Sequence, residues 1–346
     1  MGFETILPFL LPVASLLTDP TVSEIMINPG SLVFVERAGV CERVTGVEIS
    51  EAQIRTAAIM IARHLGEEIG EDRPLLDARL PDGSRVAAAF PPCSVGGAAL
   101  TIRKFQRHLF TIDELMRVGT IPAAVAEILL EAIRGRRNIL ISGGTGSGKT
   151  TLLNALTDFI PESERIVVIE DTSELRIAKP NLLPAECQTD GHTGQVSFND
   201  LLKAALRWRP DRIILGEVRG DEARTLLDSF NTGHAGSMAT IHASSAVKAL
   251  RRFGELAMRS HQQANRDDIA AEIADSVQYV VQVQRYANGR KVSEVVEVLG
   301  YDRTDKVFEF DTKFNRADTA DSAQLALPAE WAQFDGPVSS AAPIHH

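Results

Sequence analysis

Cysteine is scarce in this sequence, and its spacing excludes the common cysteine-based sites. Only Cys41, Cys93 and Cys187 occur along 346 residues, and no two of them form a CxxC pair. Neither a zinc ribbon nor a thioredoxin-type redox site is therefore available. Such a small, odd number also fits a reducing compartment better than a disulfide framework.

Aromatic residues are few, and the chain has no excess of positive charge. Phe, Trp and Tyr make up 5% of the chain, and 36 Lys and Arg residues stand against 46 Asp and Glu residues, for a formal net charge of −10. Proteins that grip nucleic-acid backbones are usually basic, and those that stack bases use aromatic side chains. The composition therefore disfavours strong direct nucleic-acid binding.

No apolar run is long enough to span a bilayer, which takes about 20 residues. The N-terminal segment MGFETILPFLLPVASLLTDP contains Pro8 and Pro12 and lacks the basic start of a signal peptide. It is open to two interpretations: a helix in the core, or a patch that docks on a membrane or a partner. The remaining composition, 44% hydrophobic and 24% charged, is that of a folded protein, and the length predicts about two domains.

Residues 1–105 predict a small α+β domain. A helical apolar period spans 54–65, opened by a capping box of Ser50 and Gln53 and closed by Gly66. β-rich runs separated by turn residues occur at 25–27, 32–36, 40–44, 75–80, 84–90 and 98–104. Thr111 and Glu114 form a second capping box, which opens a short helix in a connector at 106–120.

Residues 121–316 predict an α/β domain, because helices and apolar strands alternate. The expected strands include 138–142, 165–169 and 212–215. Such alternation favours a parallel sheet covered on both faces. Near the end, the runs 277–286 and 291–298 flank Ala287-Asn288-Gly289-Arg290, which predicts a hairpin. Residues 317–346 contain no Lys or Arg and predict a mobile acidic tail.

The sharpest motif is GGTGSGKTT, which matches the phosphate-binding pattern GxxxxGK[ST] between a predicted strand and a predicted helix. Its glycines let successive backbone N–H groups surround phosphate oxygens, and the following helix adds the positive end of its dipole. Lys149 is expected to reach the β and γ phosphates of ATP, and the Thr150 hydroxyl to bind Mg²⁺. The predicted nucleotide-binding residues are Gly143, Gly144, Thr145, Gly146, Ser147, Gly148, Lys149, Thr150 and Thr151.

Hydrolysis needs acids beyond this loop, and two strand ends supply candidates. The run IILGE ends in Glu217, which is placed to orient or deprotonate the attacking water. Gly216 stands where many phosphate-loop enzymes have a Mg²⁺-holding Asp, so a second carboxylate must come from elsewhere. Glu170, at the end of the strand 165–169, is the candidate for this metal-side role.

Histidines and arginines complete the set of candidates. His234 and His242 flank a turn of small residues and a β-rich run; alone, such histidines are more often structural, and no third ligand is spaced for a metal. Arginines concentrate in the N-terminal part, at Arg79, Arg85, Arg103 and Arg107. A guanidinium arriving from another domain is suited to neutralise a γ-phosphate.

Four segments in order, GGTGSGKTT, IEDTSEL, RPDRIILGEVRG and TGHAGSMATIHA, resemble the Walker A, Asp, Walker B and His boxes of the type II/type IV secretion traffic ATPases. LLDARLPDGSRVAAAFPP and LTIRKF also look like this family's N-terminal domain. The likeness covers about residues 20–310. Within the family it is greatest to the TrbB-like conjugal-transfer ATPases, because a long N-terminal extension and a tetracysteine insertion are lacking.

This resemblance implies a RecA-like ATPase domain and a role for each candidate. It implies water activation by Glu217, an Asp-box role for Glu170, and His-box roles for His234 and His242. Arg103 corresponds to an N-terminal arginine that contacts phosphate, and Arg85 is the next candidate. The implied protein is a homohexameric motor, either free in the cytoplasm or peripheral at the inner membrane, that binds ATP and Mg²⁺ and moves secretion or conjugation machinery.

Three other functions compete with this interpretation. An ATPase of a type IV pilus or of a type II secretion system shares the same boxes. A nucleic-acid motor shares the phosphate loop, but the negative charge, the few aromatic residues and the His box disfavour it. A nucleotide-binding scaffold without hydrolysis would be distinguished by the absence of steady-state ATP turnover.

Overall fold

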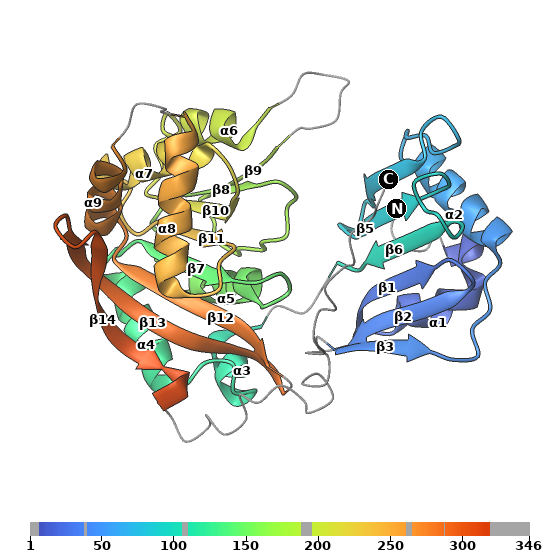
Figure 1. Ribbon diagram of the computed structural model, residues 1–346, viewed down its shortest axis with the longest axis horizontal. Coiled ribbons are helices and arrows are strands. Elements are labelled where there is room, and N and C mark those ends of the chain that lie inside the picture. The colour runs from blue at the N-terminus through green and yellow to red at the C-terminus, as the bar shows by residue number, and fades with distance from the viewer. Residues whose placement is uncertain are drawn as a thin grey trace, which may run out of the picture.

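The computed structural model describes residues 7–37, 40–105, 110–187, 196–260, 265–286 and 288–318. These residues form two separate sheets, which Figure 1 shows side by side. We call the part built on the first sheet the N-terminal unit and the part built on the second the C-terminal unit. Of the acidic tail expected at 317–346, only the first two residues lie inside the described ranges.

The N-terminal unit contains a six-stranded antiparallel sheet, in the order β3-β2-β1-β6-β5-β4. All six β-rich runs expected between residues 25 and 104 form strands of this sheet. The strands are β1 (Val22–Asn28), β2 (Leu32–Arg37), β3 (Val40–Val44), β4 (Leu75–Arg79), β5 (Arg85–Ala89) and β6 (Ala99–Arg103).

Helix α2 (Glu51–His64) packs on this sheet through apolar side chains at helical spacing, among them Ile54 and Ile61. The predicted capping box of Ser50 and Gln53 is present, which explains where the helix begins. It ends where Gly66 takes a φ of 77°, a left-handed conformation that glycine adopts without strain.

The N-terminal apolar segment joins this core, as one of its two interpretations predicted, but only a short part of it is α-helical. Two short 3₁₀ turns, Leu7–Phe9 and Leu11–Val13, precede α1 (Ala14–Thr18). Their prolines interrupt the helical hydrogen bonds, which explains why only five residues become α-helical. Within the described part, the buried apolar side chains of this segment are Leu10, Val13, Leu16 and Leu17, whereas Leu11 is 71% exposed.

The C-terminal unit contains an eight-stranded sheet in the order β14-β13-β12-β7-β11-β10-β8-β9. The six strands from β12 to β9 are parallel, and β13 and β14 add an antiparallel edge. The strands are β7 (Ile139–Gly143), β8 (Ile166–Glu170), β9 (Leu182–Glu186), β10 (Arg212–Val218), β11 (Met238–Ile241), β12 (Tyr279–Tyr286), β13 (Gly289–Asp302) and β14 (Val307–Asn315).

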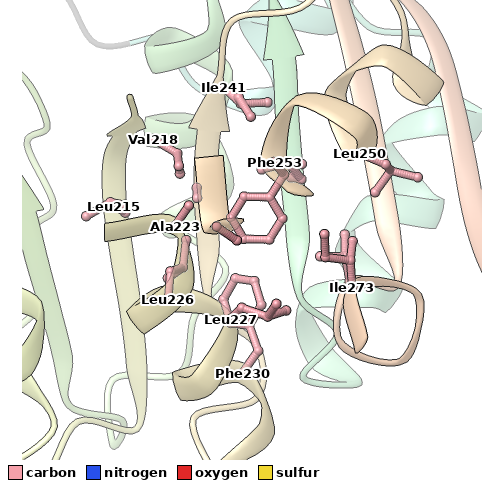
Figure 2. Close-up of a cluster of buried hydrophobic side chains, with 14 of the residues drawn as sticks. Leu215, Val218, Ala223, Leu226, Leu227, Phe230, Ile241, Leu250, Phe253 and Ile273 are labelled. Atoms are coloured by element: carbon pink, nitrogen blue, oxygen red, sulfur yellow. The ribbon is translucent and has the colours of Figure 1, made fainter. Parts of the chain in front are cut away.

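Helices cover both faces of this sheet, as the alternation predicted. Successive strand residues face opposite cores: Ile139 and Ile141 belong to one and Leu140 to the other. The second core, shown in Figure 2, packs Phe230 and Phe253 with ring centroids 6.5 Å apart. The first face carries α3 (Ile112–Arg117), α4 (Ala123–Arg134) and α5 (Lys149–Thr157), and the second carries α6 (Phe198–Ala205), α7 (Glu222–Asn231), α8 (Ala246–Ala257) and α9 (Arg266–Ser276).

The hairpin between β12 and β13 is confirmed, but its turn is shorter than expected. Tyr286 pairs with Gly289, so residues 287 and 288 alone connect the strands. Arg290, expected in the turn, therefore lies in β13 directly opposite Arg285. Strands β9 and β14 were not expected from the sequence. Within the described ranges, no helix is long and apolar enough to cross a bilayer.

Candidate active site

The phosphate-binding loop connects β7 to α5, as its motif predicts. Gly146 and Gly148 have φ angles of 66° and 99°, which side chains other than glycine adopt only with strain. Gly143 has the Ser147 side chain packed where a Cβ would project. These three glycines are therefore required by the shape of the loop. The Ser147 hydroxyl oxygen is buried and makes no hydrogen bond to any described residue.

Lys149 is folded back onto its own loop. Its side chain is buried, and Nζ donates hydrogen bonds to the carbonyl oxygens of Gly143 at 3.1 Å and Gly144 at 3.0 Å. The same Nζ lies 3.2 Å from Nε2 of His242. Burial lowers the pKa of Lys149, although the negative charge of Glu217 opposes this effect. The ammonium group is thus positioned at the centre of the site before any phosphate engages it.

His242 connects this lysine to the predicted water-activating acid. It follows β11 directly, and its Nε2 lies 3.2 Å from Oε1 of Glu217 on β10. Burial lowers the pKa of His242, and the neighbouring Lys149 reinforces the effect. The nitrogen of a neutral imidazole either donates or accepts a hydrogen bond. Nε2 therefore bonds to Lys149 or to Glu217 at any one time, so that the histidine can exchange partners when either group moves.

Arg219 contacts the second carboxylate oxygen of Glu217. This residue was not among the candidates predicted from the sequence. Its guanidinium donates to Oε2 of Glu217 at 2.9 Å and to Oδ2 of Asp171 at 3.1 Å. Burial acts to raise the pKa of Glu217, but Arg219, His242 and Lys149 together hold it below its usual range. Glu217 is therefore a carboxylate at neutral pH. A basic residue two positions after a strand-end acid was the signal that could have identified Arg219.

Glu170 is more deeply buried than the sequence suggested. Its side chain is 4% exposed, and Oε1 accepts hydrogen bonds from the backbone N–H groups of Glu174 at 2.9 Å and Leu175 at 3.0 Å. Burial raises the pKa of Glu170 to about 7. A Cβ placed on Gly216 would lie 3.1 Å from its Cγ. The carboxylate thus lies beside Gly216, where the missing acid was expected, but here it organises the turn after β8.

The two predicted histidines lie at opposite ends of the same central strand, β11. β11 runs parallel to β7, with Met238 beside Ile139 and Ile241 beside Ser142. His242 follows the end of β11 at the phosphate-loop edge, whereas His234 precedes its beginning. Nδ1 of His234 lies 3.3 Å from the carbonyl oxygen of Ser229. The structure therefore brings His242 to the site and does not bring His234 there within this chain.

A cavity of about 300 Å³ lies where the two units meet beside the phosphate loop. The N-terminal unit supplies two of the predicted arginines, Arg85 and Arg103, and the loop supplies Thr145, Gly146 and Thr150. Nη2 of Arg103 lies 3.7 Å from Oε1 of Glu174. The other lining residues are Ser23, Glu24, Glu36, Gly83, Lys104, Phe105, Phe110, Thr151, Asn154, Thr172, Glu174, Arg285 and Arg290.

The donors around this cavity fit a nucleotide. Gly146 in its left-handed conformation and cationic side chains from both units line the cavity and suit phosphate groups, and the helix that begins at Lys149 follows the same loop. The cavity offers fewer protein groups to a bound Mg²⁺ than to the phosphates. Thr150 lines the cavity, and no group of three or more His, Cys, Asp or Glu side chains in the described ranges is arranged to hold a metal. Mg²⁺ that keeps waters and phosphate oxygens as ligands fits such a site.

Known proteins have sequences and structures related to those of this chain. The family model described as type II/IV secretion system protein matches residues 10–311. The conjugal transfer protein TrbB of Rhizobium radiobacter is 39% identical over 293 residues, 82% of this chain and 86% of the relative. The type IV secretion system protein PtlH of Bordetella pertussis is 36% identical over 309 residues, 82% of this chain and 91% of the relative.

One solved structure illustrates the shared fold. The Legionella pneumophila ATPase DotB matches with a TM-score of 0.61 and 21% identity, over 88% of this chain and 82% of that one. At this identity the likeness concerns the architecture, an α/β core preceded by a smaller N-terminal unit.

Proposed function

The chain belongs to the type II/IV secretion system protein family, and we propose that it is an ATP hydrolase that powers a type IV secretion or conjugal transfer apparatus. The observation that carries this proposal is the connected row from Lys149 through His242 to Glu217 beside a glycine-rich phosphate loop. It unites a phosphate-binding cation with an ionised carboxylate. Binding and hydrolysis need these two groups together.

Each side chain has a separate task in this mechanism. Lys149 leaves the carbonyl oxygens of its own loop and binds the β and γ phosphates of ATP. Glu217, kept ionised by Arg219, orients the attacking water and accepts its proton. His242 releases Lys149 and bonds to Glu217 instead, which holds the carboxylate in position.

Other groups neutralise charge during the reaction. Arg103 and Arg85 approach the γ-phosphate from the N-terminal unit. Thr150 and Glu170 are the protein groups we assign to Mg²⁺, which would balance the phosphate charge. Glu170 must lose its proton and leave part of its backbone hydrogen bonding to fill that role, because burial raises its pKa to about 7.

We further propose a division into an N-terminal domain at 1–105, a connector at 106–120, a RecA-like ATPase domain at 121–316 and an acidic tail at 317–346. Placing the nucleotide between the two domains lets hydrolysis change how they sit together, and this motion would drive the apparatus. The assembly we propose is a homohexamer in the cytoplasm, at the inner face of the membrane that holds the secretion machinery.

Steady-state ATP turnover of the purified chain tests the enzymatic part of this proposal. Wild type should hydrolyse ATP in a Mg²⁺-dependent way, and Lys149→Ala should not. Arg303→Ala, at an exposed ion pair with Asp268, serves as a matched control and should keep the wild-type rate. Wild type without turnover, but with intact nucleotide binding, would favour a scaffold over a motor.

Deletion of the gene in its own host tests the biological part. Loss of plasmid transfer or of protein secretion, restored by wild type and not by Glu217→Gln, is the expected result. Loss of pilus retraction or of type II secretion instead would favour the second candidate. Binding to single-stranded DNA that weakens steeply with salt would favour a nucleic-acid motor.

A further inference from the structure

Each unit contributes one pair of arginines to the lining of the cavity. In the N-terminal unit, Arg85 and Arg103 are direct cross-strand partners on β5 and β6. In the C-terminal unit, Arg285 and Arg290 are direct partners on β12 and β13. All four line the cavity. Like charges placed directly opposite each other destabilise a strand pair. Each pair is therefore costly to the sheet unless an anion lies close to it.

Arg290 is the member of the second pair that bridges the two units. Its Nη2 lies 3.1 Å from Oε1 of Glu36 on β2, and the two side chains are 32% and 20% exposed. Glu36 also accepts a hydrogen bond from the Ser23 hydroxyl at 3.1 Å, which fixes the carboxylate. The ion pair thus connects the hairpin of the C-terminal unit to the sheet of the N-terminal unit at the cavity wall.

The same arginine lies against the phosphate loop. A Cβ placed on Gly148 would lie 3.3 Å from Cδ of Arg290. Its Nε is buried and has no hydrogen-bond partner among the described residues. Gly148 belongs to the part of the loop whose N–H groups cradle the α and β phosphates. A guanidinium with a spare donor therefore lies next to the place where those phosphates bind.

We propose that Arg290 is a nucleotide-binding residue of this enzyme and that Glu36 is the carboxylate it gives up when nucleotide enters. This inference rests on the proposed function, because the ligand is the same nucleotide. A phosphate oxygen replaces Glu36 as the acceptor, since a guanidinium binds phosphate through two parallel hydrogen bonds. Filling the cavity thereby breaks one ion pair between the two units and frees the N-terminal unit to move.

Arg290 should differ from Arg103 in the phosphates it senses. Because Arg290 lies at Gly148, it serves the α and β phosphates, which ADP and ATP share. Arg103, by contrast, is assigned to the γ-phosphate, which ADP lacks. Removing Arg290 should therefore weaken both nucleotides, and removing Arg103 should leave ADP binding unchanged.

Calorimetric titration of the full-length chain with ADP and with a non-hydrolysable ATP analogue, both with Mg²⁺, tests the proposal. Arg290→Ala should weaken both affinities by about tenfold or more, the usual effect of losing a hydrogen-bonded charge. Arg290→Lys should fall between this variant and wild type. Arg303→Ala and Asp268→Asn, at an exposed ion pair on the same unit, are the matched controls and should bind as wild type.

The Glu36→Gln variant distinguishes two effects of Glu36: competition with phosphate for Arg290, and direct repulsion of the nucleotide. Alone it should tighten ADP binding, because Arg290 no longer has a competing partner, and it should have no effect in the Arg290→Ala background. Equal tightening in both backgrounds would overturn the exchange, since Glu36 would then act on the nucleotide directly. Should Arg290→Ala fail to fold by circular dichroism, unchanged ADP affinity in Glu36→Gln and Arg290→Lys would overturn the proposal equally well.

The titrations also separate this inference from the proposed function. Wild type that binds ADP, with loss of binding in Lys149→Ala, supports the phosphate site by itself. In that case an Arg290→Ala chain with wild-type affinity overturns only the role of Arg290. Wild type that binds neither nucleotide overturns both the proposed function and this inference.

Discussion

Glu170→Gln should change how the stability of the C-terminal unit depends on pH. Burial raises the pKa of Glu170 from 4.5 to about 7, so the folded chain keeps this proton where the unfolded chain has released it. Between these values the folded state binds more protons, and its stability falls as pH rises. Multiplying the difference between the two pKa values by about 1.4 kcal/mol per pH unit gives a total loss of about 3.5 kcal/mol between pH values well below 4.5 and pH 8.

Glutamine is a suitable replacement because its side chain cannot titrate in this pH range but still has an oxygen that accepts hydrogen bonds. Its Oε1 can still accept from the N–H groups of Glu174 and Leu175, so the turn after β8 retains both hydrogen bonds. The free energy of unfolding of wild type should therefore fall by about 2.5 kcal/mol more than that of the variant between pH 5 and pH 8, because part of the loss occurs below pH 5.

Guanidinium unfolding without nucleotide or Mg²⁺ measures this difference. Trp208 packs against the core of the C-terminal unit, so its fluorescence reports that unit when the other tryptophan, Trp331, is replaced by Phe. Glu255→Gln, at an exposed carboxylate on α8, is the control and should follow wild type at every pH. If wild type and Glu170→Gln gave parallel curves, Glu170 would be ionised in the folded chain and the reasoning from burial would fail.

Three further outcomes follow from the site. Lys149→Ala should reduce ATP turnover to less than about a tenth, since the β and γ phosphates lose their cation; a rate above this limit would exclude the loop assignment. Glu217→Gln should bind ATP normally and turn it over about a hundredfold more slowly, the effect of losing a positioned base, and an unchanged rate would remove Glu217 from catalysis. Arg103→Ala should lower turnover strongly with ADP affinity unchanged; full activity would shift attention to Arg85.

Local chemistry made much of the fold predictable. The capping boxes opened by Ser50 and Thr111 both occur, and they set the first turns of α2 and α3 through hydrogen bonds within four residues. The alternation of helices and apolar strands likewise predicted a parallel sheet. Such signals need no knowledge of distant residues, which is why they could be interpreted from one sequence.

Edge strands were harder to predict. β9 contains Pro184, which argues against a strand in the middle of a sheet but is tolerated at an edge. β14 alternates Phe308, Phe310 and Phe314 with polar residues, a period that should have indicated a strand.

The sequence predicted most residues of the site, but it did not predict all of the contacts between them. Glu217 lies near the carboxyl end of β10 and His242 directly follows the adjacent parallel strand β11, and the carboxyl ends of such strands meet on one side of the sheet. The separation of His234 follows from the same rule, since it precedes the strand that His242 follows. Arg290 could not be found, because its place opposite Arg285 depends on a turn two residues shorter than expected.

The contacts across the cavity explain how a nucleotide could change the arrangement of the two units. Among the described residues, each apolar core contains members of one unit alone. The bridging ion pairs are Arg79 with Glu186, Arg103 with Glu174 and Arg290 with Glu36.

Partly exposed pairs of this kind each contribute about 0–1 kcal/mol. Phosphate groups bound in the cavity compete for two of these guanidinium groups, those of Arg103 and Arg290, and bind them through charge-assisted hydrogen bonds. A ligand shifts a conformational equilibrium by the difference between its affinities for the two states. Because the ion pairs of Arg103 and Arg290 are weak, phosphate oxygens that replace their carboxylates bias the arrangement of the two units.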